Sequence, residues 1–338
     1  MTPEELSERL TAFLARRTGA ASVRVDNLRR LTGGASREIW SFDATVEGPD
    51  GARTMPLVLR MDPRGGPLAT DRALECRLLQ AAFACGVKVP EVRFEGDDSL
   101  GAPFFIMERI EGETIARRLL RDEQYAEARR VMPEQLAQIL ARIHRVPYEN
   151  YGLDALPSAP PDRSPAEGEV DRYEQVYRAI TPEPHPAFEL TFRWLRRNLP
   201  QGEERALVHG DFRIGNVIFG PEGVRAVLDW ELAHIGDPME DLGWICVRSW
   251  RFGGALPVGG IGEREPFWRA YEEAGGFPVD PERVRFWEVF GNLRWGIICI
   301  SQARTYLDGR SPSVELASIG RRISETEWEL LNLIEEAR

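Results

Sequence analysis

The sequence predicts an α+β fold with two lobes, a small and mostly antiparallel β lobe with one key helix, followed by a larger, mainly helical lobe. Three observations predict it. The first hundred or so residues carry short apolar runs separated by glycine-containing turns, with one helical apolar stripe among them. The rest of the chain mostly shows helical spacing, and a tight hairpin interrupts it. We expect the first lobe at residues 1–107, a hinge at 108–112 and the second lobe at 113–338.

Length and composition bound the class of protein. A chain of 338 residues with 43% apolar and 29% charged residues suits a soluble globular protein of about two domains. The first ten residues are acidic and amphipathic, and no apolar run approaches membrane-spanning length, so we expect neither a signal peptide nor a membrane span. The net charge of −11 makes nucleic acid and anionic membranes poor partners, because both are bound mainly through basic patches.

The cysteines are scattered along the chain without close pairs, which argues against a zinc site or a disulfide framework. Such usage fits a reducing compartment, so we expect a cytoplasmic protein. We interpret all four cysteines as core residues: Cys76, Cys85, Cys246 and Cys299.

The first predicted hairpin has a glycine-containing turn. Two strands flank the segment from Leu31 to Glu38. Gly33 and Gly34 let backbone N–H groups approach anionic oxygens, and Ser36 adds a hydroxyl donor. The turn therefore suits nucleotide phosphates, although an ordinary hairpin turn explains the same residues.

The next strand and helix bring opposite charges together. The apolar run 57–61 is a predicted strand that contains Arg60, and the apolar stripe in 74–83 has helical spacing. Glu75 lies beside that stripe, in position to pair with Arg60. A plain surface carboxylate is the alternative interpretation of Glu75.

A buried strand at 104–107 ends in a charged, glycine-containing segment, which we interpret as the hinge between the lobes. A helix with apolar residues at core spacing follows and ends at His144, interpreted as a packed or capping histidine. Residues 147–168 contain too much proline for a helix and are expected to form a long connecting loop.

A second hairpin brings three oxygen-bearing side chains together. With its tip between Glu222 and Gly223, Asn216 and Asp229 are expected to face each other across its base, beside Asp211 in the preceding loop. Such oxygens suit Mg²⁺, so Asn216 and Asp229 are candidate metal ligands. Asp211 is then left free to orient and deprotonate an attacking hydroxyl. A surface hairpin with polar ends is the alternative.

The residues shortly after this hairpin predict the start of a helix. Asp237 is expected as the N-cap, Pro238 as the first helical residue, and Glu240 as the side chain that completes a capping box. Asp241 lies one turn further into the same helix.

These motifs resemble the protein-kinase-like fold, in which an Asp five residues before an Asn acts as base and a later strand-end Asp holds Mg²⁺. Here that set is Asp211, Asn216 and Asp229. The form His-Gly-Asp at 209–211 and the run Gly-Asp-Pro-Met-Glu-Asp-Leu at 236–242 resemble the aminoglycoside phosphotransferase and choline kinase superfamily. The earlier Val-Leu-Arg strand resembles a subgroup of kinase-like domains fused to, or encoded near, acyl-CoA dehydrogenases.

The resemblance implies an ATP- and Mg²⁺-dependent kinase that binds its nucleotide on the first lobe. Asp211 would act on the acceptor hydroxyl, while Asn216 and Asp229 would hold the metal. Arg60 stands where kinases carry the lysine that holds the α- and β-phosphates; it keeps the charge with a different geometry. The resemblance implies further nucleotide-site residues and structural supports: Gly33, Gly34, Ser36, Glu75, and main-chain atoms of Glu108 and Ile110 for the nucleotide, and His209, Asp237 and Asp241 for support.

The acceptor is expected to be a small molecule. Only seven residues separate Asp229 from Asp237, which leaves no room for the long activation segment that binds peptides in protein kinases. From Gly243 to Arg338 there are 14 acidic and 12 basic residues, no obvious excess for a polycationic aminoglycoside, and many aromatic residues. A hydroxyacyl or acyl-CoA-type acceptor is the first interpretation, with aminoglycosides, other amines and sugars as alternatives.

Two questions stay open at this point. A regulatory pseudokinase that binds nucleotide without transferring phosphate is an alternative of another class, motivated by Arg60 in place of the lysine. The glycine-rich segment 253–262 is either a lid over the acceptor or a flexible loop.

Overall fold

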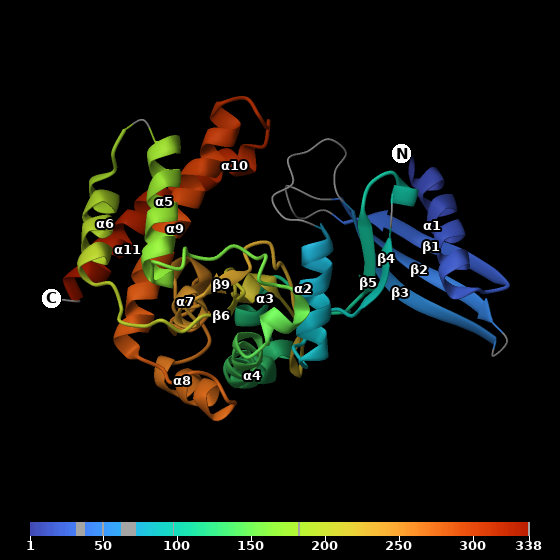
Figure 1. Ribbon diagram of the computed structural model, residues 1–338, viewed down its shortest axis with the longest axis horizontal. Coiled ribbons are helices and arrows are strands. Elements are labelled where there is room, and N and C mark those ends of the chain that lie inside the picture. Colours follow the sequence, from blue (N-terminus) through green and yellow to red (C-terminus); the bar gives the residue numbers. More distant parts are fainter. Residues whose placement is uncertain (32–37, 49–50, 62–71, 97, 182, 337–338) are drawn as a thin grey trace.

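Two lobes are visible in the computed structural model, which describes residues 1–31, 38–48, 51–61, 72–96, 98–181 and 183–336. Figure 1 shows a β-sheet with one helix beside the N-terminus and a larger body of helices that contains the C-terminus. The predicted α+β architecture is confirmed. Among the described residues, none of the helices combines the length and the apolar character that crossing a bilayer requires.

The small lobe is built on a five-stranded antiparallel sheet with the order β1-β2-β3-β5-β4. Its strands are β1 (Ser22–Arg30), β2 (Glu38–Gly48), β3 (Gly51–Met61), β4 (Val92–Gly96) and β5 (Phe104–Glu108). β3 is the central strand and pairs with both β2 and β5. Arg60 therefore sits near the end of the central strand, opposite Phe105 on β5.

Helix α1 (Pro3–Thr18) covers one face of this sheet. The Thr2 hydroxyl accepts from the Glu5 N–H, and the Glu5 carboxylate accepts from the Thr2 N–H, so the helix begins with a capping box. Phe13 of α1 packs edge-on against Phe104, with 4.9 Å between ring centroids. The sequence predicts one helix in this lobe; α1 is a second, and its signal is the Thr-Pro-Glu-Glu start.

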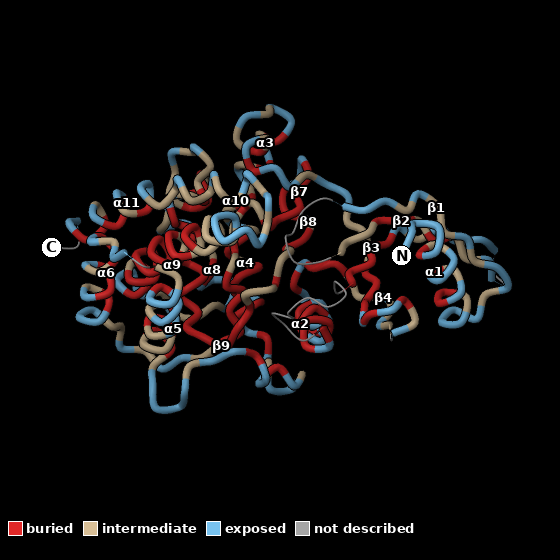
Figure 2. Tube along the Cα trace, turned by 90° about the horizontal axis from the view of Figure 1, so that it is seen from above, coloured by how far each residue is buried: buried red, intermediate tan, exposed pale blue. Residues whose placement is uncertain are grey.

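Helix α2 (Arg72–Ala84) covers the opposite face and joins the two lobes. Its buried side chains form one apolar cluster with Val58 and Phe105 of the sheet and with the core of the helical lobe. Leu57 and Leu59 belong to the separate cluster under α1, because neighbouring strand residues point to opposite faces. Arg60, two residues after Val58, consequently points toward α2 and the helical lobe. Figure 2 shows α1 and α2 on either side of the sheet.

The larger lobe is mainly helical and is organised around the long helix α9. This helix is buried on most of its surface and contacts α5, α6, α7, α10 and α11. Its helices are α3 (Ala116–Arg121), α4 (Ala126–His144), α5 (Pro165–Ile180), α6 (Pro186–Arg197), α7 (Met239–Trp244), α8 (Arg264–Glu273), α9 (Pro281–Leu307), α10 (Val314–Ile319) and α11 (Ile323–Glu336). Short 3₁₀ turns include η3 (Tyr148–Tyr151), η4 (Ile214–Asn216), η5 (Arg248–Arg251) and η6 (Gly320–Arg322).

Helix α5 begins inside the segment predicted as a proline-rich loop. The Ser164 hydroxyl accepts from the Glu167 N–H, and Pro165 is the first helical residue. Proline is tolerated there because the N–H of the first helical residue has no intrahelical partner. The prediction of a loop through Gly168 is therefore wrong for its last residues.

Three of the four cysteines are buried as predicted, whereas Cys85 is only partly buried. Burial raises the pKa values of Cys76, Cys246 and Cys299 to about 12. Thiols of that kind are poor nucleophiles at neutral pH. Cys85, which directly follows α2 and lies beside Tyr151, packs against the edge of the main core cluster, so the predicted core position is only partly correct for it.

Two small sheets position the central loop of the helical lobe. They are β6 (Ala206–Val208) paired with β9 (His234–Gly236), and β7 (Val217–Gly220) paired with β8 (Gly223–Val227). The predicted hairpin is present, but its tip lies between Pro221 and Glu222, and a bulge shifts the register. Leu228 rather than Asp229 therefore lies opposite Asn216, and its N–H donates to the Asn216 carbonyl at 2.8 Å.

Candidate active site

The Asp211 carboxylate is held by three donors at the mouth of the loop after β6. Its Oδ1 accepts from Arg213 Nε at 3.0 Å and from Trp244 Nε1 at 2.9 Å, and its Oδ2 accepts from Asn216 Nδ2 at 2.6 Å. The sequence pattern does not predict these three donors. These bonds fix the orientation of a partly buried carboxylate.

Asp241 holds the same loop from the buried side. Its Oδ2 accepts from the His209 N–H at 2.8 Å, and its Oδ1 accepts from the Gly210 N–H at 3.0 Å. The Oδ2 atom also lies 3.1 Å from Nε2 of His144, at the end of α4. Burial alone would raise the pKa of Asp241, but its hydrogen bond with His144, and the charges around it, hold that pKa below the usual value.

Gly210 allows the sharp backbone turn between His209 and Asp211. Its φ is +78°, and a Cβ there would lie 2.3 Å from the carbonyl oxygen of Leu232. A side chain at this position would therefore meet both backbone strain and a collision. The Gly in the His-Gly-Asp motif thus has a physical cause in this structure.

His209 is a fully buried, neutral member of the loop. Its Nδ1 accepts from the Asp211 N–H at 3.1 Å, and its Nε2 lies 3.0 Å from the Leu228 carbonyl. A backbone N–H only donates and a carbonyl only accepts, so the single ring proton resides on Nε2. Burial lowers the pKa of His209, which agrees with a neutral ring. The ring ties the loop of Asp211 to the strand that leads to Asp229.

Asp229 lies in a cluster of like charges. It has a φ of +64°, and it lines a cavity of about 880 Å³ together with Asp211 and Glu231. Burial, followed by the charges of Glu231 and Asp211, raises the pKa of Asp229 to about 6. Asn216 uses its amide nitrogen on Asp211, which leaves its oxygen for a cation. The carboxylates of Asp229 and Glu231 in this cavity, with the Asn216 amide bonded to Asp211 beside it, are oxygen ligands of the kind that Mg²⁺ prefers.

The raised pKa of Asp229 predicts how metal binding depends on pH. Because this pKa is raised, the fold without metal favours the protonated form of Asp229. The contribution of that protonated form to the stability of the fold is lost as the pH rises through about 6. A cation needs the carboxylate, so protons compete with it below that pH. We expect the Mg²⁺-dependent part of nucleotide affinity to be about tenfold weaker at pH 5 than at pH 7 and to level off above 7.

Titration calorimetry with and without Mg²⁺ across this pH range tests that expectation. Protons also compete with Mg²⁺ for the nucleotide, and the same titration with Asp229→Asn separates that effect from the titration of Asp229. A ratio of the two affinities that does not change between pH 5 and pH 7, or that changes equally in Asp229→Asn, would contradict it.

Arg60 connects the two lobes at this site. Its Nε lies 3.0 Å from Oε1 of Glu75 on α2, and its Nη2 lies 3.2 Å from Oε1 of Glu231. Glu75 also binds Arg72 at 2.8 Å, so two guanidinium groups share one buried carboxylate. The sequence pattern does not predict the contact with Glu231. Its signal is the position of Glu231 two residues after Asp229, on the loop that carries the metal candidate.

The hinge candidates follow the last strand of the sheet. Glu108 is the final residue of β5, and its N–H donates to the Glu91 carbonyl at 2.9 Å. Within the described part of the chain, the N–H of Ile110 makes no hydrogen bond. The Ile110 N–H is thus a main-chain donor that is available at the predicted hinge. The other predicted nucleotide contacts, Gly33, Gly34 and Ser36, lie outside the described residues.

Asp237 is bound more extensively than an N-cap requires. Its Oδ1 accepts from the Met239 N–H at 2.8 Å, and its Oδ2 accepts from Arg283 Nε at 2.6 Å and Trp287 Nε1 at 2.8 Å, both on α9. The helix starts at Met239 instead of Pro238. Asp237 therefore anchors the start of α7 to the central helix of the lobe.

The predicted capping box is wrong because Glu240 is used elsewhere. Its carboxylate binds His234 Nε2 at 3.0 Å and the buried Arg294 at 2.7 Å. Burial alone would lower the pKa of His234, but the charge of Glu240 and its hydrogen bond raise it to about 9. A buried guanidinium needs a carboxylate partner, and this need outweighs a single helix cap.

Trp244 connects that buried charge to Asp211. The guanidinium of Arg294 lies 4.7 Å from the ring centroid of Trp244, whose N–H binds Asp211. Arg213, the second donor to Asp211, lies 4.6 Å from the ring centroid of Trp250. In the sequence these aromatic residues look like core. Only the fold shows that one of them reaches the carboxylate.

The glycine-rich segment 253–262 lies against the core at its second half. Val258 is fully buried, and a Cβ on Gly259 would lie 2.8 Å from Ile214, next to the catalytic loop. Backbone bridges join Leu256 to Gly260 and Val258 to Gly262. The segment thus has its own internal structure and supports the loop of Asp211 from one side.

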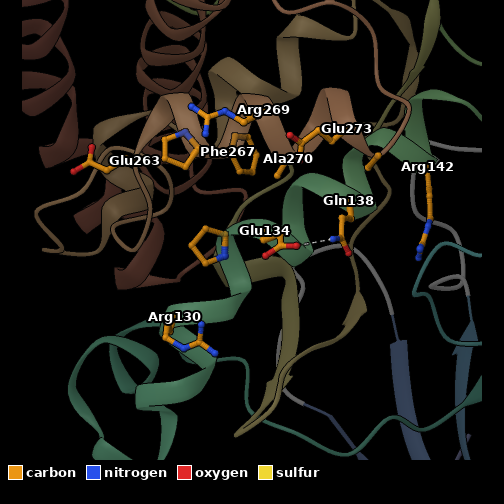
Figure 3. Close-up of a pocket in the computed structure, with 12 residues that line it drawn as sticks. Arg130, Glu134, Gln138, Arg142, Glu263, Phe267, Arg269, Ala270 and Glu273 are labelled. Carbon is orange, nitrogen blue, oxygen red and sulfur yellow. Dashed lines mark hydrogen bonds between the residues drawn. The ribbon is translucent and has the colours of Figure 1, made fainter.

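A separate hollow lies between α4 and α8 and is drawn in Figure 3. It has a volume of about 680 Å³, and Gln138 donates to Glu134 across one of its walls at 3.1 Å. Its charged residues are balanced, and Asp211 does not line it. They are Arg130, Arg142, Arg269, Glu134, Glu263 and Glu273.

Comparison with proteins of known sequence finds relatives named as acyl-CoA dehydrogenases. The chain is 36% identical over 197 residues to "Acyl-CoA dehydrogenase family member 10" of Mus musculus, covering 56% of this chain and 18% of the relative. It is 29% identical over 323 residues to "Probable acyl-CoA dehydrogenase IBR3" of Arabidopsis thaliana, covering 86% of this chain and 38% of the relative. The chain thus spans well under half the length of these curated relatives.

Comparison with solved structures finds the same fold in phosphotransferases. A "putative aminoglycoside phosphotransferase" from Ralstonia eutropha JMP134 has a TM-score of 0.76 at 24% identity, covering 96% of this chain and 97% of that one. The macrolide 2′-phosphotransferase MphH from Brachybacterium faecium has a TM-score of 0.61 at 21% identity, covering 93% and 97%. A thermostable mutant of the aminoglycoside phosphotransferase APH(4)-Ia, solved with AMP-PNP and hygromycin B, has a TM-score of 0.59 at 18% identity, covering 96% and 98%.

These structural likenesses show the fold, and the family follows from the sequence itself. The model of the phosphotransferase enzyme family matches residues 27–287. That span contains the central strand with Arg60, the loop of Asp211 and the whole of α7. Since the match covers most of the chain, the chain belongs to the phosphotransferase enzyme family.

Proposed function

We propose that this protein transfers the γ-phosphate of ATP to a hydroxyl of a small molecule, with Mg²⁺ as its metal. One observation carries the proposal: Asp211 is fixed by three donors in a cavity that it shares with Asp229 and Glu231. A positioned carboxylate beside a cation site is the arrangement that phosphoryl transfer to an alcohol requires.

The hydrogen bonds of Asp211 indicate which of its atoms meets the acceptor. Oδ1 already accepts two hydrogen bonds, from Arg213 and Trp244, whereas Oδ2 accepts one, from Asn216. A carboxylate oxygen has two lone-pair positions, so the free position is on Oδ2. The acceptor hydroxyl would donate its hydrogen bond to that position. Its oxygen would attack the γ-phosphorus, and the bond from that phosphorus to the leaving oxygen of ADP would break. The proton of the acceptor hydroxyl would pass to Asp211.

Other residues of the chain would bind and orient the reactants. Asn216 and Asp229 would hold Mg²⁺, which when bound neutralises charge on the phosphates. Arg60 would contact the phosphates, and the main chain at Glu108 and Ile110 would contact adenine. The remaining assignments in the proposal are Gly33, Gly34 and Ser36 for the phosphates, Glu75 for Arg60, and His209, Asp237 and Asp241 for the loop. We further propose lobe boundaries at 107 and 113 and a cytoplasmic location.

A hydroxyacyl or acyl-CoA-type metabolite is the acceptor that the observations favour. The relatives that match over the family domain carry acyl-CoA dehydrogenase names, although the chain spans only 18% to 38% of them. Solved neighbours named for aminoglycosides and macrolides make an antibiotic acceptor the second candidate, but at 24% identity or less they support the fold alone.

A product search tests the activity. Purified protein, Mg²⁺ and ATP are incubated with a metabolite extract supplemented with hydroxyacyl-CoAs and aminoglycosides, and mass spectrometry looks for products heavier by one phosphate. A product made by wild type and not by Asp211→Asn identifies the acceptor. If ATP binds tightly and no acceptor is phosphorylated, a regulatory pseudokinase replaces the proposal.

Replacing Arg60 with Met tests the phosphate contact. We expect ATP affinity to fall by about tenfold to a hundredfold, because a hydrogen bond to a charged group contributes roughly 1.5–3 kcal/mol. Glu75 keeps Arg72 at 2.8 Å as a partner, so the change does not leave a lone buried carboxylate. Calorimetry with Mg²⁺ and AMP-PNP measures the effect, with Arg24→Met on the exposed edge as control. Unchanged affinity would remove Arg60 from the phosphate site.

A further inference from the structure

A second cavity adjoins the one that contains Asp211. It has a volume of about 890 Å³ and lies among α3, η5, α9 and the start of α11. The two cavities share four lining residues, Arg213, Trp250, Trp295 and Ile319. A molecule with its hydroxyl at Asp211 can therefore extend into the second cavity.

The charge of this second cavity is opposite to that of the chain. The chain has a net charge of −11, whereas the lining has four arginines and two glutamates. The arginines come from segments far apart in sequence: Arg117 on α3, Arg213 after the catalytic Asp, Arg248 on η5 and Arg322 on η6. Folding thus concentrates positive charge at one place on an acidic protein.

Three of these arginines are not committed to close partners. Arg117 is exposed, and no ion pair involves it within the described ranges of the chain. Arg248 lies 3.7 Å from Glu329, and Arg322 lies 3.8 Å from Glu325, both too long for a hydrogen bond. Their N–H groups are free to bind an oxyanion, a ligand that suits the planar guanidinium.

Aromatic side chains form the rest of the lining. The rings of Trp250 and Trp295 lie 4.7 Å apart, and Trp328 is 69% exposed at the rim. Trp250 is only 5% exposed, and its indole N–H has no hydrogen-bond partner among the residues the structure describes. The cavity suits an apolar chain that ends in an anion.

We infer that the acceptor is anionic, and that Arg117, Arg248 and Arg322 bind its oxyanion while Trp250 and Trp295 contact its apolar part. The inference rests on the proposed transfer of phosphate at Asp211. It also disfavours polycationic acceptors, because arginines outnumber glutamates in this lining. A carboxylate and a phosphate share the chemistry that these residues recognise.

Three forms of one hydroxylated fatty acid test the acceptor chemistry: the free acid, its neutral methyl ester and its coenzyme A thioester. We expect at least one of the two anionic forms to have a KM about tenfold or more below that of the ester. A preference for the free acid assigns the site to a carboxylate, and a preference for the thioester assigns it to phosphates. A methyl ester used as well as both anionic forms would overturn the inference.

The triple variant Arg117→Gln, Arg248→Gln and Arg322→Gln tests the residues. We expect KM for the anionic acceptor to rise at least tenfold with kcat little changed, and KM for the methyl ester to stay as in wild type. The control removes three arginines from the hollow of Figure 3, as Arg130→Gln, Arg142→Gln and Arg269→Gln. Equal KM values for wild type and the triple variant, with both folded, would overturn the assignment.

Binding without ATP separates this inference from the proposed activity. Calorimetry with the free acid and the thioester needs no turnover, so it remains informative if no acceptor is phosphorylated. Binding to wild type that is lost in the triple variant and kept in the control supports the anion site. Equal binding to all three proteins, or no binding of either probe to wild type, overturns it.

Discussion

Replacing Asp211 with Asn is expected to lower kcat by about a thousandfold, since positioned proton transfer contributes roughly 10²–10⁴ in rate. An amide cannot take the proton of the acceptor hydroxyl. It also cannot accept at both ends, so its NH₂ group would meet either Asn216 or the pair Arg213 and Trp244, all of which are donors. The variant thus removes the base and disturbs the groups that aim it.

Single-turnover and steady-state kinetics with the acceptor from the product search measure this loss. Nucleotide affinity without metal is expected to stay near wild type, because Asp211 is proposed to act on the acceptor, and the melting temperature shows whether the variant remains folded. Glu134→Gln, in the hollow of Figure 3, is the matched carboxylate control. A variant Asp211→Asn that retained more than about a tenth of wild-type kcat would remove Asp211 as the base.

The fold was accessible from local patterns because its main elements obey local rules. The hairpin of β7 and β8 is predicted by two apolar runs around a Gly-Pro-Glu-Gly turn, and the helix with Glu75 is predicted by its apolar stripe. Helix α1 and the start of α5 carry capping signals. The prediction missed them, because it took proline as a loop signal and the first lobe as mostly strands. Register was the weakest point, because the hairpin tip lies one residue earlier than predicted and a bulge restores only part of the shift, so Leu228 takes the place expected for Asp229.

The candidate site was predictable where its residues share one short motif. Asp211, Asn216 and Asp229 lie within nineteen residues, and the hairpin between Asn216 and Asp229 returns the chain, so that Asp211 contacts Asn216 and shares a cavity with Asp229. Trp244 and Arg294 reach the site only because α7 packs on α9, which no local pattern encodes. The excess of arginine in the second cavity was likewise hidden, because a count along the sequence averages over surfaces that the fold separates.

Replacing Asp241 with Ala is expected to cost about 3–5 kcal/mol of unfolding free energy, the usual loss when one partner of a buried charged network is removed. The change leaves the N–H groups of His209 and Gly210 without an acceptor and separates His144 from its carboxylate. Since total stability is roughly 5–15 kcal/mol, such a loss lowers the melting temperature strongly. Urea unfolding at pH 7 measures it.

Asp280→Ala is the control that separates this network from an ordinary helix cap. Asp280 accepts from the N–H groups of Glu282 and Arg283 at the exposed start of α9, where removal of a cap costs about 1 kcal/mol. The pKa of Asp241 is lowered in the fold, so its contribution is present above the unfolded pKa and is lost as the pH falls. The difference in unfolding free energy between wild type and Asp241→Ala should therefore shrink in acid. A difference that grew in acid, or a cost equal to that of Asp280→Ala, would show that Asp241 does not hold the loop as an ionised carboxylate.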